Sequence, residues 1–536
     1  MLGGPFIVGR VLKTLFSHPS DVFNLPIFHP EPLALAYTDH LIGESLLAAP
    51  FVALTGSLAA GINAVVLLSF VASAWAVYRL VRLIGVSRPG AFLAGLLFAP
   101  FRFSNLTFLN QLQTQFIPLG LFFALRFVRR RRRRDQAGTT ATLVVQSYFG
   151  WYYTFYLALA FALLALHGRA VGRLGRGGVR WKEVGIAVAV GVVLMLPGLL
   201  PYLQLRLSMP GYQRSLGMTA LYAADLLDYF KVNRGNWLLG RWPALTADLA
   251  CWPGLATAVL AVLGLGSLMR SQRDGPNARS QTVWSRLRRC ASRAAEPGYF
   301  VLLGAVAFVL SLGPVLHVAG RLIPVPLPYG LLYFLLPGFN GLRGPGRLAV
   351  LVLLAAAVLA GVGYDHLIRR AAPRARGARA GVFAAFLAAA VLTSISAIAL
   401  VRFPDRERMP PVYSWLARQP GAFAILELPV PATESDEDEV DALRQLYILY
   451  HGKPSLDGTT GFVPPAVRRL RAALQGFPSA PVLREVAGRG ARYLIVHLGE
   501  LNPETRSAWL NARAPGLSAR ARFGDDLVFE LGPPLR

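Results

Sequence analysis

The chain has 536 residues, of which 54% are hydrophobic and 15% are charged, and its mean hydropathy is +0.46. A soluble protein of this length needs more polar surface than that composition supplies. The net charge of +27 does not indicate a nucleic-acid-binding protein, because residues 401–536 carry 17 basic and 16 acidic residues and the excess lies in residues 1–400. The composition therefore favours a membrane protein with a nearly neutral tail, with membrane lipids and no nucleic acid among its partners.

Basic residues are concentrated in every second connection between apolar segments. Five such connections hold 27 Lys and Arg against 5 Asp and Glu, whereas the intervening loops and the N-terminal segment hold 10 Lys and Arg over a greater length. Positive charge stays on the cytoplasmic side of membrane helices, so this alternation predicts that the five connections face the cytoplasm. They are Arg79–Arg88, Arg126–Asp135, Arg169–Glu183, Arg270–Glu296 and Asp365–Arg379.

Residues 1–56 precede the first apolar segment of spanning length. That segment begins at Leu58 and must run inwards, because its far end is the basic connection at residues 79–88. Residues 1–56 therefore form a first loop, with interfacial helices, outside the cytoplasm. No signal-peptide pattern opens the chain, and we expect a further membrane helix upstream of Met1.

Three side chains near the end of this loop are candidates for catalysis. Thr38 or Asp39 can cap a helix that begins at His40, which places Asp39, His40 and Glu44 within about one and a half helical turns at the outer membrane surface. A carboxylate there can act as a general base on a hydroxyl acceptor. The alternative is that these residues serve helix capping and interfacial solvation, and the sequence leaves both interpretations open.

Residues 57–400 form the predicted transmembrane domain. A spanning helix needs about 20 apolar residues, and Thr139–His167, which is longer and basic at both ends, predicts a hairpin of two short helices that turns near Tyr148–Tyr153. With this hairpin we expect about ten membrane helices, or eleven with the upstream one. The other spans are Leu58–Ile84, Pro89–Thr107, Gln113–Val128, Ile186–Leu205, Pro253–Leu268, Tyr299–His317, Leu348–Tyr364 and Val382–Leu400.

A second group of candidates is basic and lies in the outer loops. Arg102 stands near the outer end of a helix among Asn and Gln residues, Arg343 and Arg347 border a Gly-Pro-Gly turn before another helix, and Arg214 lies in the loop after Arg206. An arginine near the membrane is costly unless it has a partner. Guanidinium groups beside a helix N-terminus suit a phosphate. The alternative is that these side chains snorkel at the membrane edge.

Residues 401–536 read as a small α/β domain outside the cytoplasm. The acidic run Glu434–Asp441 is interpreted as a solvated loop that leads into a helix; a calcium site is the alternative, although the acids do not follow EF-hand spacing. Strands are predicted at 423–429, 492–498, 517–523 and 527–531, the last two as a hairpin, and helices at 413–418, 440–450, 465–474 and 480–488.

Three pieces of the chain carry a family resemblance: FNLPIFHPEPLALAYTDHLIG at 23–43, LLPGFNGLRGPGRLAVLVLL at 335–354, and AILELP with YHGKPSLDGTTGF within 424–462. In these pieces the chain resembles bacterial GT-C-type membrane proteins, polytopic glycosyltransferases that use polyprenyl-phosphate sugars. It looks closest to an uncharacterised branch with a C-terminal extracytoplasmic domain. The resemblance implies an α-helical polytopic protein of the bacterial inner membrane, with its C-terminal α/β domain in the periplasm.

The resemblance also implies roles for individual residues. Asp39 becomes the catalytic base, assisted by Glu44 or His40. Four arginines become candidates for holding the lipid phosphate: Arg102, Arg214, Arg343 and Arg347. Family members carry a membrane helix before the first loop, commonly followed by Gly-Asp-Pro. This chain begins Met-Leu-Gly-Gly-Pro, with Gly4 in the place of that acid, so the resemblance does not by itself imply activity.

We therefore expect a transferase that moves a sugar from a polyprenyl-phosphate donor to a glycan, lipid or protein acceptor on the periplasmic side. Nothing in the sequence requires a metal cofactor, and a divalent ion is kept as an alternative. The sequence contains no Walker A motif, dinucleotide-binding fingerprint or zinc-ligand spacing. One alternative is a non-catalytic scaffold of envelope polysaccharide assembly. The other is a lipid or solute transporter, which the absence of an internal repeat disfavours.

Overall fold

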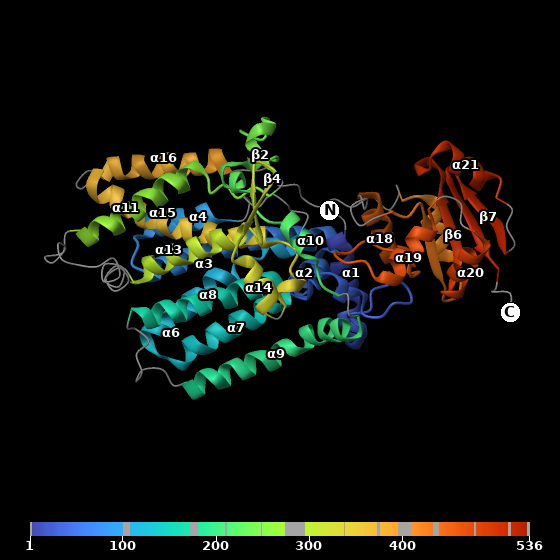
Figure 1. Cartoon of the computed structure of the whole chain (residues 1–536), viewed down its shortest axis with the longest axis horizontal. Coiled ribbons are helices and arrows are strands. Elements are labelled where there is room, and N and C mark those ends of the chain that lie inside the picture. Colours follow the sequence, from blue (N-terminus) through green and yellow to red (C-terminus); the bar gives the residue numbers. More distant parts are fainter. Residues whose placement is uncertain are drawn as a thin grey trace. The chain divides into compact units, whose positions relative to one another are not determined.

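The computed structural model describes residues 3–99, 108–171, 181–209, 212–247, 249–273, 295–336, 338–371, 376–394, 409–432, 439–475, 479–512 and 516–532. The chain divides into two compact units (Figure 1). The terminal unit comprises Met1–Ala64, Leu200–Leu205 and Leu400–Arg536, and the helical unit comprises Val65–Leu199 and Arg206–Ala399.

The helices confirm the predicted fold class, a polytopic helical protein with a small α/β domain at its C-terminus. Within the described residues, four helices are long and apolar enough to cross a membrane, and five shorter apolar helices accompany them. The helices between residues 58 and 394 are α3 (Leu58–Leu83), α4 (Arg88–Phe98), α5 (Leu109–Leu112), α6 (Phe116–Arg130), α7 (Arg133–Phe149), α8 (Trp151–Ala170), α9 (Trp181–Ser208), α10 (Leu216–Leu221), α11 (Leu255–Arg273), α13 (Ala295–Ser311), α14 (Tyr329–Leu335), α15 (Ala349–Ala371) and α16 (Arg376–Ser394).

The predicted helical hairpin between residues 139 and 167 is present. Helix α7 ends at Phe149, Gly150 adopts φ 150°, and α8 begins at Trp151. Only glycine adopts this backbone conformation without strain, so the turn falls inside the aromatic stretch where the sequence indicated it.

The helix predicted to reach His317 is shorter than expected. Helix α13 ends at Ser311, and Gly313, with φ 76°, and Pro314 separate it from a strand. Proline lacks an N–H group and cannot continue a helix. The following residues form an antiparallel hairpin of β3 (Val315–Val318) and β4 (Arg321–Pro326), which the sequence analysis missed.

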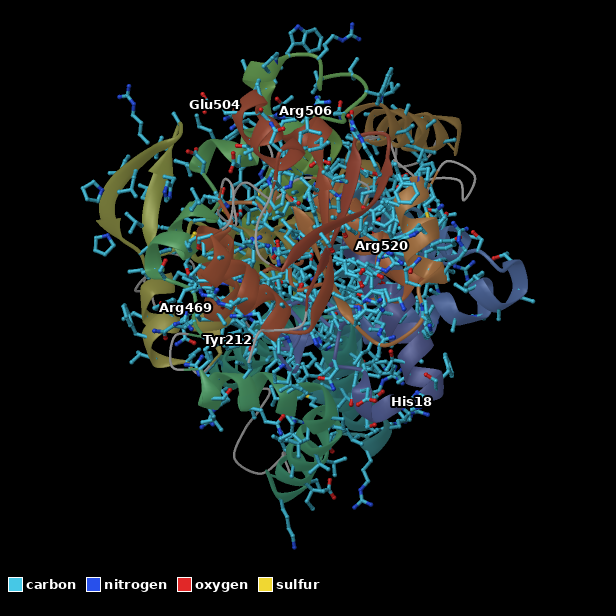
Figure 2. The ribbon with its side chains drawn as sticks, turned by 90° about the vertical axis from the view of Figure 1, so that its right-hand side faces the viewer. His18, Tyr212, Arg469, Glu504, Arg506 and Arg520 are labelled. Carbon is cyan, nitrogen blue, oxygen red and sulfur yellow. The ribbon has the colours of Figure 1, made fainter. Side chains whose placement is uncertain are left out.

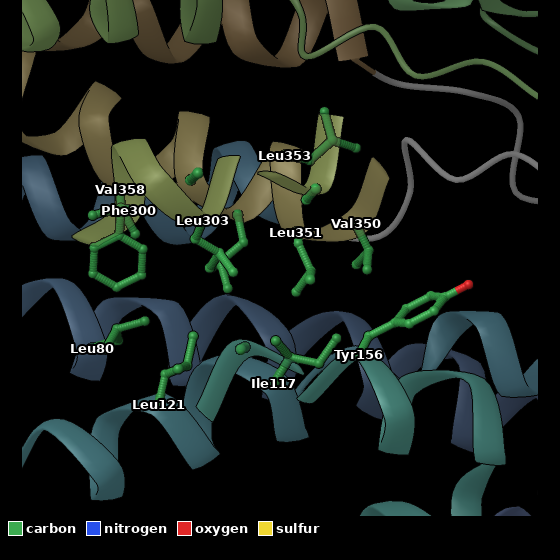
Figure 3. Packing of buried hydrophobic residues seen from close by; sticks show 14 of the residues in the cluster. Leu80, Ile117, Leu121, Tyr156, Phe300, Leu303, Val350, Leu351, Leu353 and Val358 are labelled. Atoms are coloured by element: carbon green, nitrogen blue, oxygen red, sulfur yellow. The ribbon is translucent and has the colours of Figure 1, made fainter. Parts of the chain in front are cut away.

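The core of the helical unit is built around α15, which packs against α4, α11 and α13. Glycines bring the backbones close: a Cβ on Gly363 would lie 1.9 Å from the Leu260 oxygen, and one on Gly264 would lie 2.2 Å from the Leu359 oxygen. Small residues allow this approach in membrane helices, where dispersion rather than water exclusion drives packing. Figure 3 shows the larger apolar side chains of this core, among them Leu121, Phe300, Leu303, Leu351 and Val358.

The predicted basic connections meet at one end of the helical unit. Arg129 from the second connection donates through Nη1 to the Leu83 oxygen at 2.7 Å in the first and through Nε to Glu296 at 2.6 Å in the fourth. Arg133, also in the second connection, donates to Glu183 in the third at 2.8 Å. The Ser87 N–H in the first connection donates to Asp365 in the fifth at 2.8 Å. These contacts place all five connections on one side, as the charge pattern predicts.

The terminal unit contains the predicted sheet. Its strand order is β5-β6-β8-β7, with β5 parallel to β6 and the other pairs antiparallel. The elements are β5 (Ala424–Leu428), β6 (Ala491–His497), β7 (Leu517–Phe523) and β8 (Asp526–Leu531), with helices α17 (Pro411–Arg418), α18 (Glu439–His451), α19 (Pro465–Ala473), α20 (Ala480–Gly488) and α21 (Pro503–Leu510). The predictions of all four strands and of the first four helices are confirmed. Helix α21 was not predicted, although its N-cap Asn502 accepts a hydrogen bond from the Thr505 N–H at 2.8 Å. Figure 2 labels Glu504 and Arg506 on α21 and Arg520 on β7.

The N-terminal loop belongs to the same unit as this sheet. Helices were expected in this loop, although the bounds of the first were not predicted, and it contains α1 (Gly3–Ser17) and α2 (Ile42–Thr55). The His29 N–H donates to the Ser455 oxygen and the Ser455 N–H donates to the Pro26 oxygen, both at 3.0 Å. Tyr37 stacks on Phe462 with 6.0 Å between ring centroids. Two segments that lie some 400 residues apart in sequence therefore pack as one body.

Candidate functional site

Two groups of candidate residues were predicted, and each lies in its own unit. In the helical unit, the Gly-Pro-Gly turn that carries Arg343 and Arg347 leads into α15. Tyrosines hold the turn in place. The Arg343 N–H donates to the Tyr152 hydroxyl oxygen at 2.9 Å, and the Tyr156 hydroxyl donates to the Gly344 oxygen at 3.1 Å. Because both tyrosines belong to the apolar helix α8, the turn has a rigid backbone support.

The faces of both guanidinium groups lie against aromatic rings. The Arg347 guanidinium carbon lies 4.1 Å from the ring centroid of Tyr152 and 5.7 Å from that of Phe108, and Arg343 lies 4.4 Å from that of Tyr222. Such cation–π contacts hold the planar group by its faces and leave the N–H edges for acceptors. With the amide oxygen of Gln111 turned towards Arg347, Nη2 donates to it at 3.0 Å.

A second pair of arginines lies against the same loop. Arg206 donates through Nη1 to the Asn340 side-chain oxygen at 2.9 Å, and the Arg214 N–H donates to the Asn340 backbone oxygen at 2.9 Å. The Tyr333 hydroxyl donates to the Arg214 oxygen at 2.6 Å. The segments 206–214 and 340–347 are therefore neighbours, and we call their four arginines, Arg206, Arg214, Arg343 and Arg347, the outer arginine cluster. Arg102 lies outside the described residues.

The outer arginine cluster lies at the end of the helical unit opposite the basic connections. Helix α15 begins next to the cluster, after Leu348, and its other end contacts Ser87 through Asp365. Among the described residues, Arg343 forms no ion pair with an acidic side chain. Within that part of the chain, its guanidinium lies over the ring of Tyr222 and has no paired carboxylate, an arrangement suited to receiving an anionic ligand.

In the terminal unit, the first candidate group differs from its prediction in detail. Helix α2 begins at Ile42 after the N-cap Leu41, and neither Thr38 nor Asp39 caps it. The expectation of a helix starting at His40 with one of these caps was wrong. Instead, Nδ1 of His40 accepts from the Ile42 N–H at 3.3 Å, so the imidazole satisfies an orphan donor of the first turn.

Burial separates the three candidates Asp39, His40 and Glu44. His40 is 0% exposed and packs edge-on against Phe23 and Tyr202, with ring centroids 6.3 Å and 6.2 Å away. Glu44 is 1% exposed, and within the described part of the chain neither of its carboxylate oxygens has a hydrogen-bond partner. Asp39 is only partly buried. Of the three, Asp39 alone is open to an acceptor from solvent.

The terminal unit also holds a buried charge network that the sequence analysis missed. Glu427 accepts from the Tyr413 hydroxyl at 2.7 Å and from Nε2 of His497 at 3.0 Å, and Nδ1 of His497 donates to Asp526 at 2.7 Å. Burial by itself lowers the pKa of His497, but the hydrogen bonds to Asp526 and Glu427 raise it to about 9. Burial likewise raises the pKa of Glu427, yet the hydrogen bond and charge of His497 bring it down to about 2. The network is therefore an imidazolium held between two carboxylates.

Within the described residues, no group of three or more His, Cys, Asp and Glu side chains is arranged to hold a metal ion. The network around His497 lies inside the sheet domain, between β6, β5 and β8. The acidic run at 434–441, for which calcium was the alternative, lies largely outside the described residues.

No protein-family model and no curated protein matches this sequence. The solved structures that are similar to this chain include two of ArnT. ArnT from Cupriavidus metallidurans in the apo state has a TM-score of 0.45 and 13% sequence identity, and the match covers 98% of this chain and 93% of that chain. ArnT bound to undecaprenyl phosphate has a TM-score of 0.40 at the same identity and coverage. Both TM-scores lie below 0.5, so the likeness assigns no activity to this chain.

Proposed function

We propose that this chain is a membrane glycosyltransferase of GT-C type, which moves a sugar from a polyprenyl-phosphate carrier to an acceptor hydroxyl at the periplasmic face of the bacterial inner membrane. The observation that carries the proposal is the outer arginine cluster, in which Arg343 and Arg347 are held by aromatic faces at the start of α15. The convergence of the basic connections at the other end of the same unit supports the orientation.

A lipid-linked phosphate suits this cluster chemically. Guanidinium groups donate two parallel N–H bonds to phosphate oxygens, and the start of a helix adds partial positive charge. When the bond between the sugar carbon and the phosphate oxygen breaks, the electron pair goes to the phosphate. Fixed positive charge that faces this oxygen stabilises the transition state more than the ground state. Arg343 and Arg347 are proposed for this role, with Arg214 as a further phosphate contact.

Asp39 is proposed as the general base. In the transfer, the acceptor oxygen bonds to the sugar carbon and its proton passes to the carboxylate. Asp39 is the accessible member of its group, whereas His40 and Glu44 are buried. We therefore assign His40 to positioning, because it holds the first turn of α2 through the Ile42 N–H. Glu44, whose side chain is buried, is proposed to assist Asp39. The donor, the acceptor glycan, lipid or protein, and membrane lipids are the proposed partners.

The test is binding of undecaprenyl phosphate to the purified full chain in detergent. Removing a charge-assisted hydrogen bond costs about 1.5–3 kcal/mol, so Arg343→Ala and Arg347→Ala should each weaken binding by about tenfold or more. Arg321→Ala is the matched control, because Arg321 is an exposed arginine on β4 in the outer loops of the same unit. Equal affinities of all three variants and the wild type would remove the phosphate assignment.

A second candidate function is a non-catalytic scaffold that binds the lipid carrier. The burial of His40 and Glu44 favours it, because two of the three candidate acids and bases are closed to solvent. The two functions differ in one variant. Asp39→Asn should abolish sugar transfer if the chain is a transferase and leave lipid binding intact. If Asp39→Asn also leaves the cellular glycan unchanged while Arg343→Ala alters it, the scaffold is the better account.

A further inference from the structure

The basic end of the helical unit contains an apolar cavity that the proposed transfer does not use. Its volume is about 530 Å³, and it lies where α3, α4, α15 and α16 meet. Four aromatic side chains form its walls: Tyr78, Phe92, Tyr364 and Phe383. Ligand-binding pockets commonly have volumes in this range, and here the walls offer mainly apolar surface.

The walls are held together by aromatic contacts but stay open on one side. The ring of Phe383 lies 6.3 Å from that of Phe92 and 6.1 Å from that of Tyr364, between centroids. Tyr364 is buried, whereas Phe92 is 53% exposed. An exposed phenylalanine beside an apolar cavity is unfavourable in water and favourable against hydrocarbon. The cavity is therefore shaped to receive an alkyl chain from the bilayer.

Two arginines, Arg88 and Arg379, border the same cavity. Arg88 is the first residue of α4, and Arg379 lies in the first turn of α16, so two helix N-termini add partial positive charge beside the two guanidinium groups. The nearby carboxylate of Asp365 is hydrogen-bonded by the N–H and hydroxyl of Ser87 and pairs with Arg369 at 3.6 Å. The described side chains that line the cavity thus include two guanidinium groups and no carboxylate, which suits an anionic ligand.

We propose that this cavity binds one anionic phospholipid of the cytoplasmic leaflet. An acyl chain lies between the aromatic walls, and the headgroup phosphate lies between Arg88 and Arg379. Charge complementarity and the apolar walls together select this ligand, because basic pockets between membrane helices at the cytoplasmic side recognise anionic headgroups. The lipid ties the start of α4 to the start of α16, two helices that also meet through the Phe92–Phe383 contact.

The test is native mass spectrometry of the purified full chain exchanged against phosphatidylglycerol and, separately, phosphatidylcholine. The wild type should retain phosphatidylglycerol in preference. The double variant Arg88→Gln/Arg379→Gln should weaken that retention by about thirty-fold, which corresponds to about 1 kcal/mol for each basic side chain. The control Arg130→Gln/Arg134→Gln removes two exposed charges from another connection at the same end and should retain the lipid.

A third variant tests the contribution of the apolar cavity to lipid binding separately from that of the two arginines. Ala380→Trp fills the cavity beside Arg379 and keeps both arginines, so it should also lose the lipid. This variant decides the question if the double variant fails to fold. Three results would overturn the proposal: equal retention of the two lipids by the wild type, equal losses in the two double variants, or full retention by Ala380→Trp. Retention of polyprenyl phosphate alone, which has a distinct mass, would also overturn it.

Discussion

The guanidinium of Arg347 lies 4.1 Å from the centre of the Tyr152 ring, and the hydroxyl of the same tyrosine accepts from the backbone N–H of Arg343 at 2.9 Å. One side chain on α8 thus positions both arginines proposed to hold the lipid phosphate: one through its ring face and one through its oxygen. The pair links the helical hairpin, where the chain turns at Gly150, to the start of α15.

Two substitutions of Tyr152 should therefore separate the contribution of its ring from that of its hydroxyl to lipid binding. Tyr152→Phe keeps the ring and removes the hydrogen bond, and Tyr152→Leu removes both. A cation–π contact is worth about 0.5–2 kcal/mol, so Tyr152→Leu should weaken undecaprenyl phosphate binding several-fold more than Tyr152→Phe does. Tyr148→Leu is the control, because its hydroxyl donates instead to the Leu194 oxygen. Equal effects of the two Tyr152 variants would show that the ring face does not position Arg347.

The buried carboxyl of Glu44 should lower the thermal stability of the folded chain. A buried polar group without a partner costs about 1–3 kcal/mol, and both oxygens of Glu44 lack hydrogen bonds within the described residues. Glu44→Met should therefore raise the thermal unfolding temperature of the purified chain in detergent. Glu31→Gln, in the same loop, should leave it nearly unchanged. A lower unfolding temperature for Glu44→Met would mean that the carboxyl is satisfied and contributes to the fold.

The His497 network predicts a defined pH dependence. The pKa of His497 is raised to about 9 by its hydrogen bonds to Asp526 and Glu427, against an unfolded value of about 6.5. A raised pKa means that the native state holds the proton more tightly, so the stabilisation is fully present below about pH 6.5 and is lost as the pH rises through about 9. His497→Gln removes this contribution.

The measurement is the unfolding free energy of the full chain in denaturant, followed by tryptophan fluorescence, because Trp415 and Trp509 pack within the sheet domain. The difference between wild type and His497→Gln should be largest near pH 6.5 and should shrink towards pH 9. A difference that stays constant over this range would show that His497 is not charged in the fold.

The contact between α11 and α15 should tolerate no side chain at Gly363. A Cβ there would lie 1.9 Å from the Leu260 oxygen, so the helices must move apart. Gly363→Ala should lower the unfolding temperature and expression level clearly. Gly266→Ala on α11, where an added Cβ meets nothing within 4 Å, should be neutral or stabilising, because alanine favours helix by about 1 kcal/mol over glycine. Similar stabilities of the two variants would contradict the close packing.

Much of this architecture could be predicted from the sequence. The basic connections predicted which ends of the helices lie together, and the contacts of Arg129 and Asp365 bear this out. Apolar runs beside turn residues located the strands, and Gly524 with its neighbours located the hairpin of β7 and β8. These features depend on local patterns of charge and hydrophobicity, which a single sequence displays directly.

The hairpin of β3 and β4 and the helix α21 are local features that were missed, whereas the other missed features depend on contacts between distant residues. The packing of residues 26–37 against 455–462 has no local signal, and neither has the burial of His40 and Glu44, which are polar residues in a loop rich in proline and aromatic residues. In the sequence, the tyrosines near the arginines appear only as part of an aromatic stretch. Their hydrogen-bond partners depend on the packing of α8 against the turn before α15, which the sequence does not display.

The most direct measurement is sugar transfer itself. Membranes from cells that express the wild type, Arg343→Ala, Asp39→Asn or Arg321→Ala, at matched levels, would be compared for envelope glycan and for release of polyprenyl phosphate from a panel of labelled polyprenyl-phosphate sugars. We expect transfer and release in the wild type and in Arg321→Ala, and their loss in the other two variants. Undiminished transfer in both Arg343→Ala and Asp39→Asn would contradict the proposed mechanism.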